Sequence, residues 1–258
     1  MTTDTLPPWP YPRWIAHRGA GKLAPENTLA AFSLGASHGY RMFECDVKLS
    51  SDGVPFLLHD STLQRTTNAK AQWGTGLSAV AGDYPWSALS QLDAGGWHSR
   101  SFAGEPIPTF AAIAHYCIAN GYFLNIEIKP TPGTERRTGE VVAEHAAHLW
   151  KDATVPPLLT SFDTEALEGA QTAAPDLPRG LLLDTLWKGW LETALTLDCQ
   201  AIVCNHALWD TSSVTQAKSA GFRTLSYTVN DEWAAERLIA LGTDGIITDR
   251  VDLFSPSR

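Results

Sequence analysis

Short apolar segments alternate with segments of helical periodicity along most of the chain, and this alternation restricts the fold more than any other feature. A short apolar run bounded by turn residues predicts a buried strand, whereas apolar residues three and four apart predict a helix. The predicted strands cover residues 14–17, 42–47, 122–128, 158–162, 180–183, 201–204, 224–229 and 245–248. The predicted helices cover residues 29–38, 109–120, 137–150, 164–173, 187–195, 212–220 and 232–241. Eight strands, all but the last followed by a helix, predict an α/β fold, the (β/α)8 TIM barrel.

Two further pieces interrupt this alternation after the second predicted strand. The turn at residues 51–53 is too short for a parallel crossover, so we expect residues 54–59 to return as the second arm of a β-hairpin. Residues 60–108 are irregular and rich in Gly, Ser and Thr, with one weak helical piece near residues 86–92. A loop-rich insertion of this length is usually functional, as a lid or a binding wall. A packed segment that only shields apolar surface fits the sequence equally well.

Charged side chains stand in or directly after several of the predicted strands. His17 and Arg18 end the first strand, Glu44 and Asp46 lie in the second, and His59 ends the hairpin arm. Burying an unpaired charge is costly, so the presence of several charged groups in buried strands needs a common explanation. A divalent metal and a phosphate together would provide one.

A third carboxylate and a lysine occur at the end of a later strand, at Glu127 and Lys129. Residues two apart on a strand share a face, so the polar residues of both strands point into the barrel mouth while their apolar neighbours face the helices. Functional residues of this fold gather at that end of the strands. Three converging carboxylates without thiolates predict a hard cation, Mg²⁺ or Ca²⁺. For any one of them alone, a salt bridge to Arg18 or Lys129 would be sufficient explanation.

His17 and His59 are the natural proton-transfer pair, because imidazole titrates near neutral pH. One would remove a proton from the attacking oxygen and the other would protonate the leaving oxygen; the sequence leaves open which does which. Arg18 and Lys129 would supply fixed positive charge for a phosphate. No glycine-rich nucleotide loop of either common pattern follows a strand, which argues against nucleotide chemistry.

Composition limits the partners and the compartment. The net charge of −9, from 19 basic and 28 acidic residues, argues against broad binding to nucleic acid or anionic membranes. The four cysteines lack a zinc-type spacing and are interpreted as reduced core residues. No signal peptide and no apolar run of spanning length is found, so we expect a cytoplasmic protein without a stable membrane anchor. The proline-rich residues 1–12 are expected to form an arm on the surface, and a homo-oligomer is compatible with the sequence.

Several short motifs occur in a fixed order from about Trp14 to Asp249, and together they resemble the glycerophosphodiester phosphodiesterase family, in its bacterial cytosolic form. The main motifs are His17-Arg18-Gly19, Pro25-Glu26-Asn27-Thr28, Glu44-x-Asp46, His59-Asp60 and Asn125-Ile-Glu127-Ile-Lys129. Lesser ones are Leu92-Asp93-Ala94-Gly95, Ser161-Phe162, Tyr227-Thr228-Val229-Asn230 and Gly245-Ile-Ile-Thr-Asp249. The multi-part signature is far more specific than any single piece.

The resemblance implies that Glu44, Asp46 and Glu127 are metal ligands. It also implies that His17 and His59 are the acid and the base of a phosphodiester hydrolysis. The implied substrates are glycerophosphodiesters such as glycerophosphocholine and glycerophosphoethanolamine, and the implied products are glycerol 3-phosphate and an alcohol. We therefore expect residues 1–258 to form a single TIM-barrel phosphodiesterase domain.

The resemblance further makes Arg18 a phosphate contact and Lys129 a second one, so substrate affinity is expected to depend strongly on Arg18. Residues 60–108 correspond to the family's insertion, which helps to wall the glycerol end of the pocket. Where the family usually has tryptophan before Thr-Val-Asn, this chain has Tyr227, which leaves the headgroup preference open. Direct attack by water and attack by the glycerol hydroxyl through a cyclic phosphate both remain open.

Two other functions are compatible with parts of this pattern. A related barrel enzyme acting on lysophospholipids, like a lysophospholipase D, would need an exposed apolar groove, which Trp73, Trp86 and Trp97 of the insertion leave open. A non-catalytic ligand-binding barrel would keep the fold alone. The complete set of two histidines, three carboxylates, an arginine and a lysine weighs against that second alternative.

Overall fold

The structure, a computed structural model, describes residues 8–74 and 76–256 and has a closed barrel at its centre. Within these residues eight parallel strands form the barrel, because β1 pairs with β2 on one side and with β9 on the other. The strands are β1 (Trp14–Ala16), β2 (Met42–Leu49), β4 (Phe123–Ile128), β5 (Leu158–Ser161), β6 (Arg179–Leu183), β7 (Ala201–Asn205), β8 (Arg223–Tyr227) and β9 (Gly245–Thr248). The predicted (β/α)8 barrel is confirmed.

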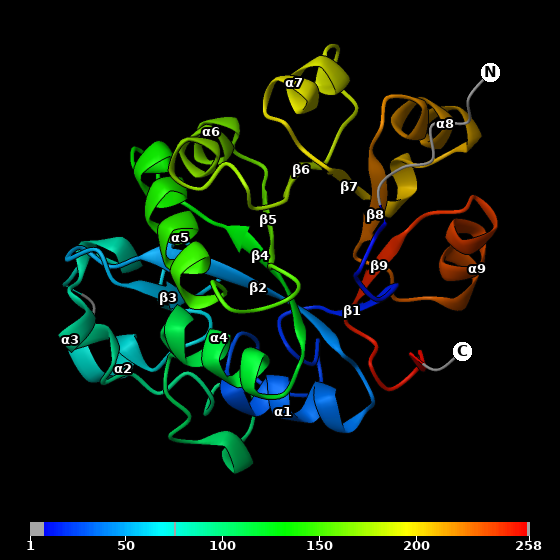
Figure 1. The fold of residues 1–258 in the computed structure, drawn as a ribbon. Coiled ribbons are helices and arrows are strands. Elements are labelled where there is room, and N and C mark those ends of the chain that lie inside the picture. Colours follow the sequence, from blue (N-terminus) through cyan, green and yellow to red (C-terminus); the bar gives the residue numbers. More distant parts are fainter. Residues whose placement is uncertain (1–7, 75, 257–258) are drawn as a thin grey trace.

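Helices connect successive strands and surround the barrel, as Figure 1 shows. They are α1 (Leu29–Ser37), α4 (Phe110–Ala119), α5 (Glu135–Leu149), α6 (Thr164–Ala173), α7 (Trp190–Thr196), α8 (Thr211–Ser219) and α9 (Glu232–Ala240). Several begin at a side chain that accepts a hydrogen bond from a backbone N–H of the first turn, as Thr28, Asp163 and Asp231 do. These capping residues explain why the helix starts were predictable to within a few residues.

The two faces of each strand pack as the alternation of residue types predicted. On β2, Phe43, Cys45 and Val47 belong to the large apolar core between the sheet and the helices. Met42, on the opposite face, belongs to a second core inside the barrel, together with Ile15, Leu158, Leu182, Val203, Leu225 and Ile247. The interior is therefore filled by apolar side chains up to the level at which the polar residues begin.

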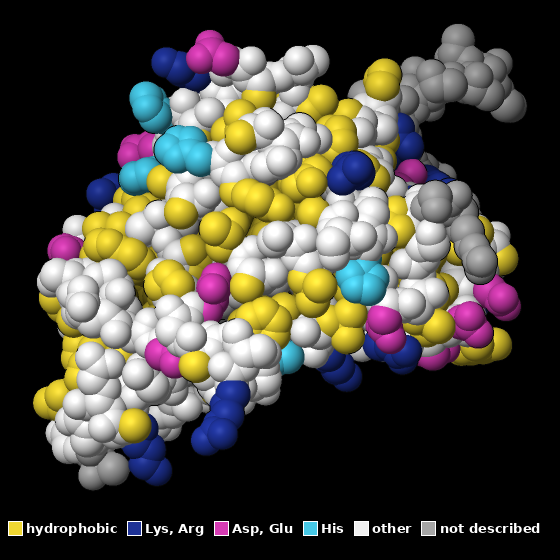
Figure 2. Space-filling view, turned by 90° about the horizontal axis from the view of Figure 1, so that it is seen from below, with side chains coloured by type: hydrophobic (Ala, Val, Ile, Leu, Met, Phe, Trp, Pro, Cys, Tyr) yellow, Lys and Arg dark blue, Asp and Glu magenta, His cyan; other side chains and the backbone are white. Residues whose placement is uncertain are grey.

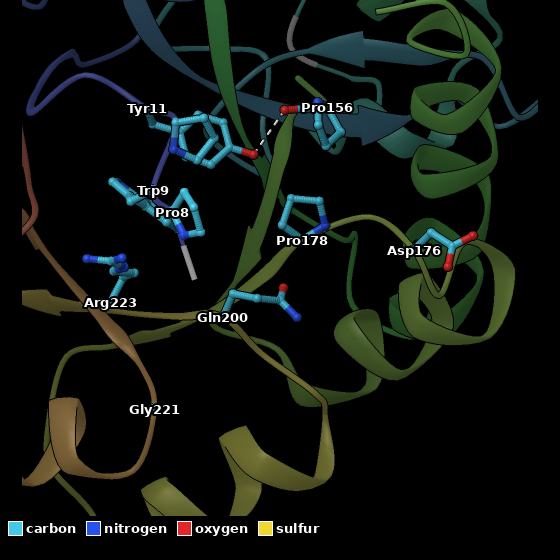
Figure 3. Close-up of a pocket in the computed structure, with 10 residues that line it drawn as sticks. Pro8, Trp9, Tyr11, Pro156, Asp176, Pro178, Gln200, Gly221 and Arg223 are labelled. Carbon is cyan, nitrogen blue, oxygen red and sulfur yellow. Dashed lines mark hydrogen bonds between the residues drawn. The ribbon is translucent and has the colours of Figure 1, made fainter. Parts of the chain in front are cut away.

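The segment before β1 closes the N-terminal end of the barrel. For the residues of this segment that the structure describes, from residue 8 onward, this corrects the expectation of a surface arm. Tyr11 is buried in the interior core, and its hydroxyl donates a hydrogen bond to the carbonyl of Pro156 at 3.0 Å. Trp9 packs edge-on against Tyr11, with ring centroids 4.7 Å apart. Figure 3 shows these rings beside Pro178 and Arg223, around a cavity of about 350 Å³.

The insertion after β2 has a small core of its own. β3 (Pro55–Leu57) runs antiparallel to β2, so the predicted hairpin is confirmed. Beyond it lie α2 (Ala69–Trp73), a 3-10 turn (Ala81–Asp83), α3 (Trp86–Leu89) and a second 3-10 turn (Arg100–Phe102). A cluster of buried side chains joins this segment to β3, with members Phe56, Leu58, Leu63, Ala69, Ala81, Leu89, Leu92, Ala94 and Ile107. The insertion is thus packed, despite its loop-rich sequence.

The outer surface is mixed in character. Figure 2, which views the molecule from below, shows hydrophobic side chains interspersed with polar ones and basic side chains dispersed among acidic ones. Among the described residues, no helix is both long enough and apolar enough to cross a membrane. The four cysteines are free and buried, as predicted.

Candidate active site

Three carboxylates converge at the C-terminal ends of β2 and β4. Asp46 and Glu127 are direct neighbours in the parallel register, and Glu44 lies two residues before Asp46 on the same face. One oxygen of each carboxylate lies within 4.8 Å of the others, and the residues are 2%, 1% and 9% exposed for Glu44, Asp46 and Glu127. The strand register, set by the apolar faces, thus brings together the three acidic residues predicted as a cluster.

Some carboxylate oxygens of this acidic cluster accept no hydrogen bond, and this bears on whether the cluster could bind a cation. Oε1 of Glu44 and Oδ1 of Asp46 are buried and accept no hydrogen bond. Burial and the charge of Asp46 raise the pKa of both Glu44 and Glu127. Burial also acts to raise the pKa of Asp46, but nearby cations outweigh it and the pKa lies below its usual range. Buried, unpartnered carboxylate oxygens fit a hard divalent cation, which binds oxygen ligands and removes their mutual repulsion.

His17 lies directly after β1, at the edge of this cluster. Its Nδ1 is 2.7 Å from Oδ1 of Asp249, and its Nε2 is 3.8 Å from Oε2 of Glu44. The Asn230 side chain holds Asp249 in place, because its Nδ2 donates to Oδ2 while its Oδ1 accepts from the Asp249 backbone N–H, both at 2.9 Å. Burial acts to lower the pKa of His17, but the bond to Asp249 and the charge of Glu44 outweigh it and leave the pKa raised.

His59 follows β3 and reaches the same region from the hairpin. Its Nδ1 is 2.8 Å from Oδ1 of Asp60, so both histidines are held at Nδ1 by a carboxylate. Burial, supported by the charges of Arg18 and Lys129, keeps the pKa of His59 below its ordinary value, although Asp46 acts in the opposite direction. In both rings the bond at Nδ1 leaves Nε2 for a ligand.

Arg18 adopts a left-handed backbone conformation, with φ of +52°, that points its amide into the acidic cluster. This N–H donates to Oε2 of Glu44 at 3.0 Å. The guanidinium donates to Oε1 of Glu26 at 2.9 Å, and its Nε lies 3.3 Å from Oδ2 of Asp46. A positive φ in a residue other than glycine is uncommon and is often found at functional sites. Gly19 makes this turn feasible, because a Cβ there would come within 2.8 Å of helix α1.

The loop from Arg18 to α1 also supports the acidic cluster through Asn27. This residue has φ of +60°, donates from Nδ2 to Oδ2 of Asp46 at 2.8 Å and accepts the Asp46 backbone N–H on Oδ1 at 3.1 Å. On β4's side, Nζ of Lys129 lies 2.8 Å from Oε1 of Glu127. Glu44 and Asp46 are therefore held through one oxygen each, Oε2 and Oδ2, and their other oxygens accept no hydrogen bond.

A cavity of about 320 Å³ opens over this site. Of the seven residues predicted from the sequence, six line it: His17, Arg18, Glu44, His59, Glu127 and Lys129. Asp46 lies beside it, within the acidic cluster. The rest of the lining is made of apolar and aromatic side chains and of neutral polar ones, namely Phe162, Leu182, Tyr227, Ile247, Asn125, Thr160 and Thr228. The cavity therefore combines charged, neutral polar and apolar surface.

Some residues of the site were not assigned a role from the sequence. Asn230 and Asp249 stand in the recognised motifs, but the contact of Asp249 with His17 joins positions 232 residues apart, which no local pattern reveals. Asn27 occurs in the Pro-Glu-Asn-Thr motif, but the motif alone does not indicate that its side chain supports Asp46. Arg65, which binds Glu26 and Asp60, stood in the insertion without any marked pattern.

Fold and site together define the class of the protein. It is a (β/α)8 barrel whose candidate active site lies at the C-terminal ends of the strands, with carboxylates able to hold a cation beside two histidines.

Comparisons with known proteins identify the family within this class. Residues 17–253 match the model of the glycerophosphoryl diester phosphodiesterase family, and the chain belongs to this family of hydrolases. The glycerophosphodiester phosphodiesterase of Caldanaerobacter subterraneus is 32% identical over 240 residues, covering 91% of this chain and 93% of that protein. The family recognised from the motifs is thereby confirmed.

Solved structures agree with this assignment. A phosphodiesterase from Oleispira antarctica, in complex with its product sn-glycerol-3-phosphate, superposes with a TM-score of 0.83 at 33% identity, covering 93% of each chain. A glycerophosphodiester phosphodiesterase from Agrobacterium tumefaciens gives 0.75 at 30% identity, covering 95% of this chain and 99% of the other.

Proposed function

We propose that the protein hydrolyses glycerophosphodiesters to glycerol 3-phosphate and an alcohol in a reaction that depends on a divalent cation. The observation that carries this proposal is the acidic cluster with unpartnered oxygens. It lies at the same cavity as two histidines and two basic side chains, Arg18 and Lys129. The product bound by the similar Oleispira enzyme, sn-glycerol-3-phosphate, supports the substrate class. Glycerophosphocholine and glycerophosphoethanolamine are the proposed substrates.

The cation is proposed to be Mg²⁺ or Ca²⁺, held by Glu44, Asp46 and Glu127. When bound, it would polarise a phosphate oxygen and stabilise the negative charge of the transition state. Arg18 and Lys129 border the same cavity and would bind the remaining phosphate oxygens. The side chains of Arg18 and Lys129 already form ion pairs with carboxylates of the site, so their positions are fixed before the substrate arrives.

His17 and His59 are the proposed acid and base. The carboxylates at their Nδ1 atoms hold the proton there and leave Nε2 of each ring to exchange a proton with the substrate. One ring would accept the proton of the attacking oxygen, whether of water or of the glycerol hydroxyl, and the other would donate a proton to the leaving alkoxide.

We also propose that residues 1–258 act as one phosphodiesterase domain in the cytoplasm. The lysophospholipid alternative loses part of its basis in the structure. Trp73 and Trp86 pack with the core of the insertion, and neither lines the cavity over the acidic cluster.

Release of glycerol 3-phosphate from the two proposed substrates tests this function. Turnover should disappear with excess chelator and return with Mg²⁺ or Ca²⁺, and it should be lost in Glu44→Ala and His59→Ala. Lysophosphatidylcholine serves as the competing substrate. Its hydrolysis without turnover of either glycerophosphodiester would replace this proposal, and full activity of both variants would refute the assigned residues.

A further inference from the structure

Arg65 lies outside the cavity but contacts two acidic residues that each hold a residue of the site. Its Nε and Nη2 donate to Asp60 at 2.7 and 2.9 Å, and its Nη1 and Nη2 donate to Glu26 at 2.8 Å each. Both edges of the guanidinium are therefore engaged by a carboxylate. Such two-oxygen contacts fix the orientation of both partners more strongly than a single bond does.

The partners of Arg65 are the residues that orient His59 and Arg18. Oδ1 of Asp60, which accepts from Arg65, is also 2.8 Å from Nδ1 of His59. Oε1 of Glu26, which accepts from Arg65, also accepts from Nη1 of Arg18 at 2.9 Å. A continuous chain of charged hydrogen bonds thus runs from His59 to Arg18 through Arg65.

The backbone around Arg65 is anchored in the packed core of the insertion. Leu63 is buried in that core, and its N–H donates to the carbonyl of Ala79 at 2.9 Å. Thr66 and Thr67 on the other side are buried, and the Thr67 hydroxyl donates back to the carbonyl of Leu63. The Arg65 side chain itself is 45% exposed, so apolar packing of the side chain does not account for its position.

We propose that Arg65 is a positioning residue for the phosphodiesterase reaction, acting on His59 through Asp60 and on Arg18 through Glu26. This inference rests on the proposed function of those two residues. It gives the insertion a role in the reaction, since the insertion core places Arg65 where both carboxylates can reach it. Arg65 does not line the cavity, and its donors are directed at Glu26 and Asp60 and not at a substrate.

Steady-state kinetics of Arg65→Met and Arg65→Lys, with the faster of glycerophosphocholine and glycerophosphoethanolamine, test this role. Lysine keeps the charge but cannot bind two carboxylates along two edges, so both variants should lose about 10- to 100-fold in kcat, as expected for small misplacements of reacting groups. Circular dichroism establishes that each variant is folded. Arg136→Met is the control, because Arg136, at 51% exposure, resembles Arg65 in exposure and pairs with a carboxylate, Glu168, between α5 and α6.

A double-mutant cycle separates positioning from general stabilisation. If Arg65 acts through Asp60, Arg65→Met should cost much less in kcat when Asp60 is already asparagine. Additive losses, or a lowered melting temperature with unchanged kcat and KM, would overturn the inference. His59→Ala is assayed in parallel. If it is inactive while Arg65→Met is fully active, the inference alone fails, whereas an active His59→Ala overturns the proposed function and the inference with it.

Discussion

Single carboxylates determine which nitrogen of each histidine faces the cavity. Asp249 at the end of β9 binds Nδ1 of His17, and Asn230 restricts Asp249 through two hydrogen bonds. A proton held at Nδ1 by a carboxylate leaves Nε2 of the neutral ring as a base. The depressed pKa of Asp249, which falls to about 2 because the bonds to His17 and Asn230 outweigh its burial, keeps this carboxylate ionised at neutral pH.

Asp249→Asn is therefore expected to lower kcat by about 10²-fold, in the range of a lost acid–base contribution. The amide retains the size of the side chain but not the charge that fixes the proton on Nδ1. KM should change little, because neither phosphate contact involves this residue. The measurement is steady-state kinetics with the same glycerophosphodiester, and Asp252→Asn, which alters an exposed pair with Arg250, is the control. A variant with the parent kcat would show that His17 needs no carboxylate.

At this scale the sequence predicted which carboxylates and histidines come together at the candidate site better than it predicted the residues that hold them. The carboxylates and histidines stand out because charge in a buried strand is costly and short motifs mark them. Arg65 stands in no recognised motif, and the motif that contains Asn27 does not indicate its role, since an amide or an arginine in a polar loop is ordinary until its partner is known. Their roles depend on loop conformation, as the positive φ of Asn27 illustrates.

At the scale of elements, the periodic segments were predictable and the close approaches between them were not. The strands and helices lie within a few residues of their predicted bounds, because burial on one or both faces imposes the pattern. Helices α5 and α6 cross in close contact at two glycines, Gly139 and Gly169. A Cβ at Gly139 would lie 1.9 Å from the carbonyl oxygen of Ala166. In the sequence these glycines appear only as weak positions in helices.

Gly139→Ala is expected to destabilise the protein by about 1–3 kcal/mol, the usual cost of overpacking. The direction of the stability change is informative, because alanine has a higher helix propensity than glycine and would stabilise a helix that is not in close contact with another element. Urea denaturation should show a lower midpoint with an unchanged slope. Glu144→Ala on the exposed face of α5 is the control. An equal or higher midpoint in Gly139→Ala would mean that the two helices can separate without cost.

For the whole molecule, closure of the barrel brings residues from both ends of the sequence into one site. β1 pairs with β9, so His17 and Asp249 meet, and β2 pairs with β4, so the acidic cluster forms. The chain carries a net charge of −9, and part of that negative charge is concentrated in this buried cluster. Because holding the carboxylates together is costly, binding of the proposed cation would be coupled to the stability of the entire fold.

Cation binding should accordingly raise the melting temperature by several degrees. A cation at about 100 times its Kd stabilises a folded protein by about 2.7 kcal/mol, and 1 kcal/mol corresponds to about 2–4 °C in a protein of this size. Thermal unfolding with chelator, and then with Mg²⁺ or Ca²⁺, measures this shift without reference to activity.

Glu44→Gln should change how thermal stability differs between chelator and added cation. With chelator the variant should be at least as stable as the parent, because it removes the Glu44 carboxyl group, whose ionisation burial and the charge of Asp46 oppose, as its raised pKa shows. With cation present it should gain little, because a ligand has been lost. Glu144→Gln on the surface should retain the full gain of the parent. If parent and Glu44→Gln gained the same number of degrees, the cation would have to bind elsewhere, and the acidic cluster would need another explanation for its unpartnered oxygens.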